Sequence, residues 1–196
     1  MENATLLKRI AHVMRADKSG RLLVKLYNAL FSEDLYGEFR AEACFTADDS
    51  MFALDDALCD LEEALDYNYD LIRSTLRDTV DRIAESALMN KGTTFTYLAH
   101  IYPIFGRSTI NKMYAEDPDD RKLKFLYIYP MMCAALVDCH PGNETEDSRR
   151  RIYQVYKELV VSSKKPSKLL KRVLTSEHLF SPIDEDVVIR EVSRTI

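Results

Sequence analysis

The sequence predicts an all-α protein: a single-domain helical bundle of about seven or eight helices round a central apolar helix. Three observations lead to this fold class. The 196 residues contain only five glycines and six prolines, which disfavours a loop-rich β fold. Apolar residues recur at helical spacing along most of the chain. One segment, residues 91–106, is apolar for about a dozen positions and lacks the polar face of a surface helix.

Composition limits the size of the fold and the kind of partner. Hydrophobic residues make up 46% and charged residues 30%, which is an ordinary globular balance. No long polar linker divides the chain, so residues 1–196 are predicted to form one domain. The net charge of −5 gives no global basic field to recruit nucleic acid. The one basic run, residues 164–172, is interpreted as a solvated helix face rather than a phosphate or lipid contact.

The N-terminal segments have the spacing of amphipathic helices. Residues 3–16 and 21–32 each carry one apolar stripe, and Ser19 and Gly20 break the helix between them. A less regular segment follows to about residue 50. Three residues there are typical helix caps: Asp48, Asp49 and Ser50.

Two further amphipathic helices are predicted next. Residues 51–72 place leucines at helical spacing with acids on the opposite face, and residues 74–89 repeat the pattern. Ser74 is the predicted cap of the second helix. Asn90, Lys91 and Gly92 end it, with Gly92 supplying the left-handed residue that helix C-termini prefer.

The segment at 91–106 is interpreted as the central core helix. Thr93 or Thr94 caps it, and Pro103 is expected to kink it because proline lacks a backbone donor. A membrane span needs about 18 continuous apolar residues, and this segment is shorter. No other window reaches that length, so no integral membrane anchor is expected.

The C-terminal half contains a second strongly apolar helix at residues 121–138, entered through a turn at 116–120. Residues 148–162 and 166–174 are predicted as additional helices. The tail from about residue 182 has no clear pattern.

No catalytic or metal-binding signature is present, so the protein is not expected to be an enzyme or to hold a cofactor. The four cysteines form no CxxC pair and are interpreted as reduced thiols of a cytosolic protein: Cys44, Cys59, Cys133 and Cys139. His100 is interpreted as a hydrogen-bonded histidine of the core or of a groove edge. Three acids, Glu62, Glu63 and Asp66, are interpreted as the wet face of their helix.

Residues 90–106 resemble the first homology motif of the Bcl-2 family of apoptosis regulators. That motif ends one helix, turns through a glycine, and starts the central helix with Asn-Trp-Gly-Arg, an apolar run and a glycine. Gly92 matches the turn glycine and Gly106 the closing one. The four motif positions are occupied here, in order, by Thr94, Phe95, Thr96 and Tyr97.

Other segments extend the resemblance. Residues 61–72 are similar to the third homology helix through Leu61 and Asp66, with Leu65 in place of a small residue. Residues 21–32 resemble the first helix, and 121–138 the second apolar helix of the central hairpin. The family-like core then covers about 21–180, and 3–16 is an extra helix that packs across the outside or contributes to a homodimer. A second homology motif is missing, since 148–180 has no tryptophan and no Gly-Gly pair.

The resemblance implies an apoptosis regulator, an inhibitor that sequesters the homology-3 helix of pro-apoptotic Bcl-2 proteins in a hydrophobic groove. This is helix-in-groove recognition without turnover. It implies these groove residues: Leu65, Tyr69, Ile72, Arg73, Leu76, Val80, Ala84, Leu88, Thr94, Phe95, Tyr97 and Leu98. The implied location is cytoplasmic, with recruitment to mitochondria through partners.

Tyr97 departs from the family at the arginine that pairs with an aspartate of the bound helix. Losing such a desolvated pair costs on the order of 2–5 kcal/mol unless another contact replaces it. Arg73 and Arg77 are candidates for that replacement. Such divergence is more typical of viral members, which implies a host–virus interaction. Two alternatives remain open: a Bcl-2-fold inhibitor of innate immune signalling acting through other surfaces, and an unrelated helical scaffold or oligomerisation protein.

Overall fold

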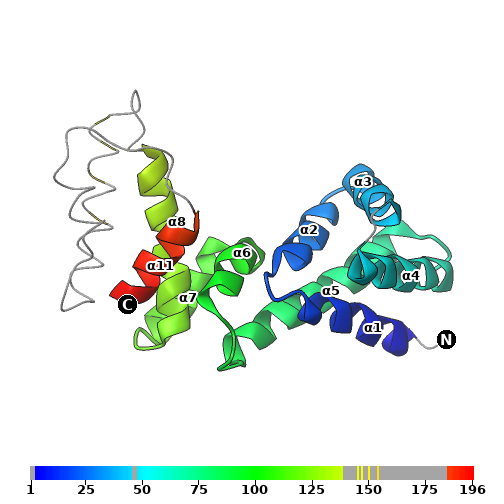
Figure 1. Ribbon diagram of the computed structural model, residues 1–196, viewed down its shortest axis with the longest axis horizontal. Coiled ribbons are helices and arrows are strands. Elements are labelled where there is room, and N and C mark those ends of the chain that lie inside the picture. The colour runs from blue at the N-terminus through cyan, green and yellow to red at the C-terminus, as the bar shows by residue number, and fades with distance from the viewer. Residues whose placement is uncertain are drawn as a thin grey trace. The chain divides into compact units, whose positions relative to one another are not determined.

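The computed structural model describes residues 3–45, 48–138 and 185–196, with 145, 147, 150 and 154 as isolated positions. All regular secondary structure in this part of the chain is α-helical, in nine helices, which confirms the predicted fold class (Figure 1). The chain divides into two compact units, residues 1–105 and 106–196. The first unit contains α1 to α6 and the second contains α7, α8 and α11.

The first two helices follow the predicted apolar stripes. α1 spans Asn3–Ala16 and α2 spans Arg21–Ala29. The corner between them is built by Asp17, whose carboxylate accepts bonds from the Ser19 N–H at 3.0 Å, the Ser19 hydroxyl at 2.6 Å and the Leu22 N–H at 2.8 Å. The side chain of Asp17 therefore satisfies donors that the start of α2 would leave unpaired.

The α1–α2 corner packs directly on α6, which spans Phe95–Phe105. Gly20 has φ +75°, and a Cβ added there would lie 2.8 Å from Cγ2 of Ile101 and 3.2 Å from the ring of Tyr97. His100 donates from Nδ1 to the Ser19 carbonyl at 2.7 Å, which confirms it as a hydrogen-bonded histidine. Glycine is required at position 20 both for the left-handed backbone and for the close approach of the two helices.

The segment predicted as irregular contains α3, Glu33–Cys44. The Ser32 hydroxyl caps it by accepting a bond from the Leu35 N–H at 3.2 Å. Its inward residues are few: Tyr36, Phe39 and Ala43. The apolar stripe is therefore too narrow for periodicity to reveal, and packing against α2 and α4 holds the helix in place.

The predicted boundary at residues 72–74 is wrong. α4 spans Asp49–Ala64 with Asp48 as its cap, and α5 spans Tyr69–Met89. Asp66 and Tyr67 have positive φ, and the Asn68 side chain caps α5 by accepting from the Leu71 N–H at 3.2 Å. Ser74 lies inside α5. Apolar spacing continues through the break, so periodicity alone cannot detect two left-handed residues.

The core of the first unit lies where α1 packs against α4 and α5 (Figure 1). Six of its side chains are almost fully buried: Leu6, Ile10, Met14, Leu54, Leu58 and Leu61. Each contributes about 1.5–3 kcal/mol of transfer free energy, so α1 is an integral part of this unit. The structure shows α1 in contact with α4 and α5, and the predicted contribution of this helix to a homodimer stays a prediction.

The start of α6 confirms one predicted feature and corrects another. The Thr94 hydroxyl caps the helix by accepting from the Tyr97 N–H at 3.2 Å. Gly92 is not left-handed; its N–H instead donates to Oδ1 of Asn90 at 2.9 Å. Four residues of α6 are buried, Leu98, Ala99, Ile101 and Ile104, whereas its aromatic residues are only half-buried. The helix is therefore not enclosed on all sides.

The second unit is described by three helices. α7 spans Arg107–Glu116, α8 spans Arg121–Asp138, and α11 spans Glu185–Thr195; α8 packs against both others. Neither α7 nor α11 was predicted. The predicted helices at 148–162 and 166–174 lie outside the described residues, and so does Cys139. Among the described helices none has the length and apolarity to cross a membrane.

Candidate functional site

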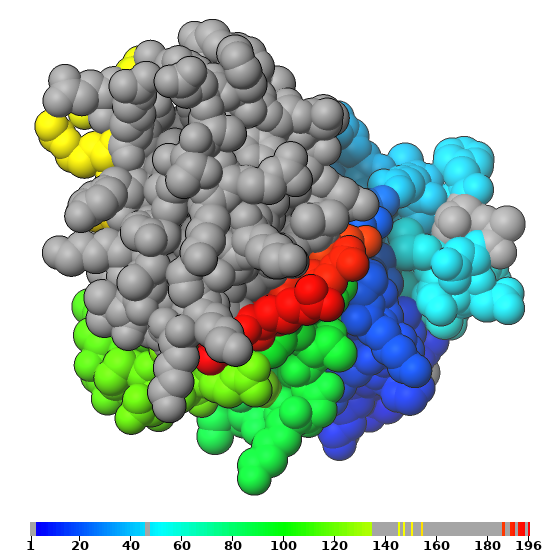
Figure 2. All heavy atoms as spheres, turned by 60° about the vertical axis from the view of Figure 1, so that its left-hand side comes forward, coloured from blue at the N-terminus to red at the C-terminus, as the bar shows by residue number. Residues whose placement is uncertain are grey.

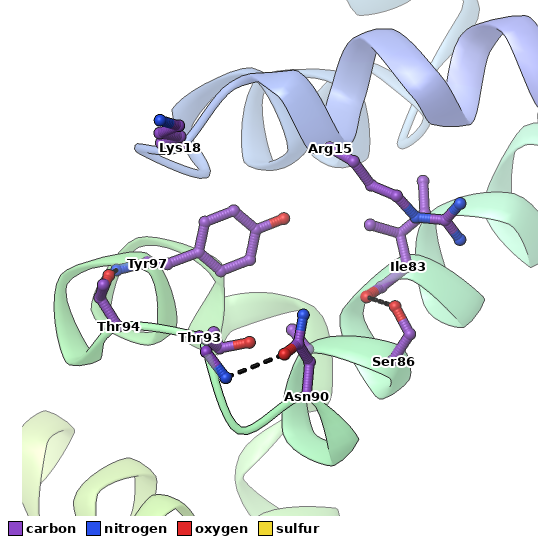
Figure 3. Close-up of a pocket in the computed structure, with 10 residues that line it drawn as sticks. Arg15, Lys18, Ile83, Ser86, Asn90, Thr93, Thr94 and Tyr97 are labelled. Carbon is purple, nitrogen blue, oxygen red and sulfur yellow. Dashed lines mark hydrogen bonds between the residues drawn. The ribbon is translucent and has the colours of Figure 1, made fainter.

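A pocket of about 360 Å³ opens in the first unit between the α1–α2 corner and the turn from α5 to α6 (Figure 3). Five lining residues belong to the segment 90–106 that resembles the homology motif: Asn90, Gly92, Thr93, Thr94 and Tyr97. The other described lining residues are Arg15, Lys18, Ile83, Ser86 and Ala87.

Local hydrogen bonds shape the floor of this pocket. The Asn90 carbonyl accepts from the Thr93 N–H at 3.1 Å, and the Ser86 hydroxyl donates to the Ile83 carbonyl at 2.8 Å. Together with the bond from the Gly92 N–H to the Asn90 side chain, these contacts fold the chain sharply from α5 into α6. The sequence Asn-Lys-Gly-Thr-Thr thus presents short polar side chains on one side of the pocket.

The charged residues of the lining are both basic. Arg15 is in the last turn of α1 and Lys18 is in the corner that follows, and both are exposed. Figure 3 shows the Arg15 side chain descending from α1 toward Ile83 on α5. Among the described residues, no carboxylate lines the pocket. Asp17, which lies between Arg15 and Lys18 in the sequence, turns its oxygens toward the donors of the corner.

Tyr97 supplies the aromatic wall. Burial raises the pKa of its phenol above the usual value, the charge of Asp17 raises it further, and Arg15 opposes this. The phenol is therefore protonated at neutral pH and able to donate a hydrogen bond. Figure 3 shows its hydroxyl end directed across the pocket, toward the side where Arg15 lies.

The structure brings only two of the twelve residues implied by the resemblance, Thr94 and Tyr97, into the pocket. Five others are packed in the core with at most 3% exposure: Ile72, Leu76, Val80, Ala84 and Leu98. Leu65, Tyr69, Leu88 and Phe95 are half-buried outside the lining, and Arg73 is exposed. The segment 61–72, expected as one homology-3-like helix, crosses the break between α4 and α5.

The two arginines considered as replacements for the motif arginine have other contacts. Arg73 donates from Nε to the Leu30 carbonyl at 2.7 Å. The guanidinium of Arg77 lies 4.5 Å from the ring centroid of Tyr27 and 5.1 Å from that of Phe31. Neither lines the pocket. The basic residues that do line it are Arg15 and Lys18, about 80 positions before Tyr97 in the sequence. Only the tertiary fold therefore shows that they share a pocket with Tyr97.

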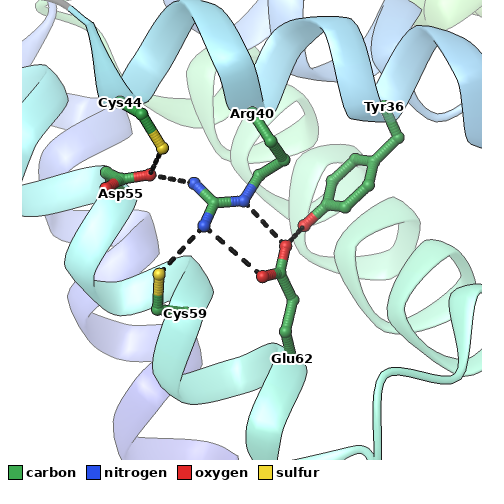
Figure 4. Close-up of polar contacts among 6 residues, drawn as sticks. All are labelled: Tyr36, Arg40, Cys44, Asp55, Cys59 and Glu62. Carbon is green, nitrogen blue, oxygen red and sulfur yellow. Dashed lines mark hydrogen bonds and ion pairs between the residues drawn. The ribbon is translucent and has the colours of Figure 1, made fainter.

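A second polar cluster, which the sequence did not reveal, joins α3 to α4 (Figure 4). Arg40 pairs with Asp55 and with Glu62, whose Oε1 lies 2.7 Å from Nε, and it contacts the Cys59 sulfur at 3.0 Å. Tyr36 donates to Glu62 at 2.7 Å. Burial and the charge of Glu62 raise the pKa of the Tyr36 phenol.

This cluster corrects the interpretation of Glu62 as part of a wet face. Its side chain is only 14% exposed, and that of Arg40 is 13% exposed. Glu63 and Asp66 are exposed as expected. Because every partner in the cluster is another residue of the same unit, we interpret it as a structural link between α3 and α4.

Cysteines and potential metal ligands also occur among the described residues. Cys44 and Cys59 are exposed and form no disulfide. In the part of the chain that the structure describes, no group of three or more His, Cys, Asp or Glu residues is placed to hold a metal ion. Two phenylalanines, Phe45 and Phe52, are 91% and 70% exposed at the ends of α3 and α4, which Figure 2 shows in cyan at the surface.

Comparison of the chain with protein-family models, with curated proteins and with solved structures finds no match. The likeness to the Bcl-2 family therefore rests on the residues of the motif-like segments alone.

Proposed function

We propose that this protein is a non-catalytic regulator of apoptosis that binds the homology-3 helix of a pro-apoptotic Bcl-2 protein. The observation that carries the proposal is the open pocket at the start of α6, with Thr94 and Tyr97 in its lining. The resemblance assigns these two positions to the motif asparagine and arginine, which contact the bound helix in that family.

The pocket offers what one anchor of an amphipathic helix needs. Ile83, Ala87 and the Tyr97 ring form an apolar wall, and the Tyr97 hydroxyl donates beside it. Met89, 86% exposed, directly precedes the lining residue Asn90. An exposed, flexible thioether is well suited to packing against a partner helix.

Binding is proposed at the pocket rather than along the buried face of α5. A groove formed by Ile72, Leu76 and Val80 would require α5 to separate from its neighbours. Exposing each of these side chains costs about 1.5–3 kcal/mol, which a helix contact would have to recover. A partner that docks over the pocket and Met89 avoids this cost.

Calorimetric titration of the full chain with a panel of homology-3 peptides tests this function. We expect saturable one-to-one binding to at least one peptide, and at least a tenfold loss of affinity, about 1.4 kcal/mol, in Tyr97→Ala. The matched control is Tyr67→Ala, since Tyr67 is 71% exposed and lies in the α4–α5 connection. The absence of heat with every peptide, from protein shown to be folded by circular dichroism, would overturn the proposal.

A further inference from the structure

The pocket at the α1–α2 corner has a charge that contrasts with the rest of the protein. The charged residues in its described lining, Arg15 and Lys18, are both basic, whereas the whole chain has a net charge of −5. We propose that this pocket is an anion-binding site for one carboxylate or phosphate group joined to a small apolar body. The proposal concerns the pocket of the proposed function, but it does not require that the partner be a homology-3 helix.

The positive charge of the pocket is not neutralised by direct contacts. Neither Arg15 nor Lys18 has an ion-pair partner within 4.0 Å among the described residues, whereas Lys25 of α2 pairs with Glu42 and Arg40 pairs with Glu62. A concave site lined by charges of one sign attracts counter-ions more strongly than the same charges spread on an open surface.

The negative charge of Asp17 partly offsets the positive charges of Arg15 and Lys18, but Asp17 is not among the residues that line the pocket. Its carboxylate already accepts three hydrogen bonds at the corner, from Ser19 and Leu22. The pKa of Asp17 is lowered by the bonds from Ser19 and Leu22, which outweigh its desolvation, so it is ionised at neutral pH. The local sum of Arg15, Asp17 and Lys18 is therefore one positive charge.

Neutral donors complete the site. The Thr94 hydroxyl accepts from the Tyr97 N–H, which leaves its own hydrogen to donate. The protonated Tyr97 phenol is a second donor. Ile83 and Ala87 add the apolar wall. A volume of about 360 Å³ is at the small end of ligand pockets and fits an anion with a compact apolar part, as in an aryl carboxylate or a phosphate monoester.

The test is an NMR titration of the ¹⁵N-labelled full chain with benzoate, phenyl phosphate and, as the uncharged counterpart, benzyl alcohol. We expect saturable shifts at the amides of Gly92, Thr94 and Tyr97 with both anions. The Kd should be on the order of millimolar, as for a ligand of about ten non-hydrogen atoms. Benzyl alcohol should bind at least about tenfold more weakly. Equal binding of benzyl alcohol and benzoate would overturn the proposal.

Charge-neutralising variants assign the binding to its residues. The double variant Arg15→Gln/Lys18→Gln should weaken binding of phenyl phosphate by about tenfold or more. The control, Lys8→Gln/Arg21→Gln, removes the same charge from exposed positions of α1 and α2 outside the lining and should change the Kd less than about twofold. If both double variants bind alike, the site is not built by Arg15 and Lys18.

Titration with homology-3 peptides distinguishes a partner carboxylate from a free small anion as the ligand. It also distinguishes failure of the anion site from failure of the proposed function. If a homology-3 peptide binds and its Asp→Asn form is weaker only when Arg15 and Lys18 are present, the anion is a partner side chain. If phenyl phosphate binds and all peptides are silent, the ligand is a free small anion and the proposed function fails. If peptides bind but neither benzoate nor phenyl phosphate does, the anion site fails and the proposed function stands.

Discussion

Two glycines of the first unit show how differently the same residue type acts. Gly20 is left-handed and in contact with α6, whereas Gly37 lies within α3 and a Cβ there would meet nothing within 4 Å. Gly20→Ala should lower the free energy of unfolding by about 2–4 kcal/mol, through backbone strain and the clash with Ile101. Gly37→Ala should raise it by about 0.5–1 kcal/mol, because alanine is the better helix former. Urea denaturation measures both, and effects of the same sign would contradict this packing.

Arg40 gives a second prediction at the scale of single residues. Arg40→Ala leaves the carboxylates of Asp55 and Glu62 without their cation in a mostly buried cluster, so stability should fall by about 3 kcal/mol. The comparison is Lys25→Ala, which removes a solvent-exposed bridge to Glu42 and should cost about 0–1 kcal/mol. Chemical denaturation of the two variants measures the difference. Equal losses would mean that the α3–α4 cluster adds no more than a surface pair.

At the scale of elements, the α1–α2 corner depends on an ionised carboxylate. The pKa of Asp17 is lowered in the folded protein, so the unfolded chain binds its proton more readily. The stabilisation is therefore present above the ordinary pKa of about 3.8 and is lost as the pH falls below it. Thermal unfolding between pH 7 and pH 3 should show a steeper acid loss for the native chain than for Asp17→Asn. Parallel curves would contradict this role.

The sequence predicted most reliably those helices that have a strong apolar stripe or a clear cap. α1, α6 and α8 lie where they were expected, and Asp48 and Thr94 act as caps. α3 was not predicted because only three of its residues face inward. The α4–α5 boundary was misplaced because Asp66 and Tyr67 adopt left-handed backbone that residue spacing does not encode. Spacing reports burial, whereas these features depend on tertiary packing and backbone geometry.

At the scale of the whole molecule, the candidate site was predictable only in part. The motif-like segment pointed to Thr94 and Tyr97. Sequence patterns could not predict that Arg15 and Lys18 line the site. The α1–α2 corner is held against α6 by the contact of His100 with Ser19, which are 81 positions apart. Residues expected in an open groove, such as Leu76 and Val80, are instead core. An apolar stripe is the same in sequence whether it faces the interior or a partner.

The central claim is that a partner helix binds at the start of α6. The most direct measurement is ¹⁵N chemical-shift mapping of the full chain during titration with the homology-3 peptide that gives the largest calorimetric signal. The account predicts that the largest shifts fall on Gly92, Thr94 and Tyr97 and on the α1–α2 corner. Shifts concentrated elsewhere, for example at the exposed Phe45 and Phe52, or no shifts at saturating peptide, would contradict it.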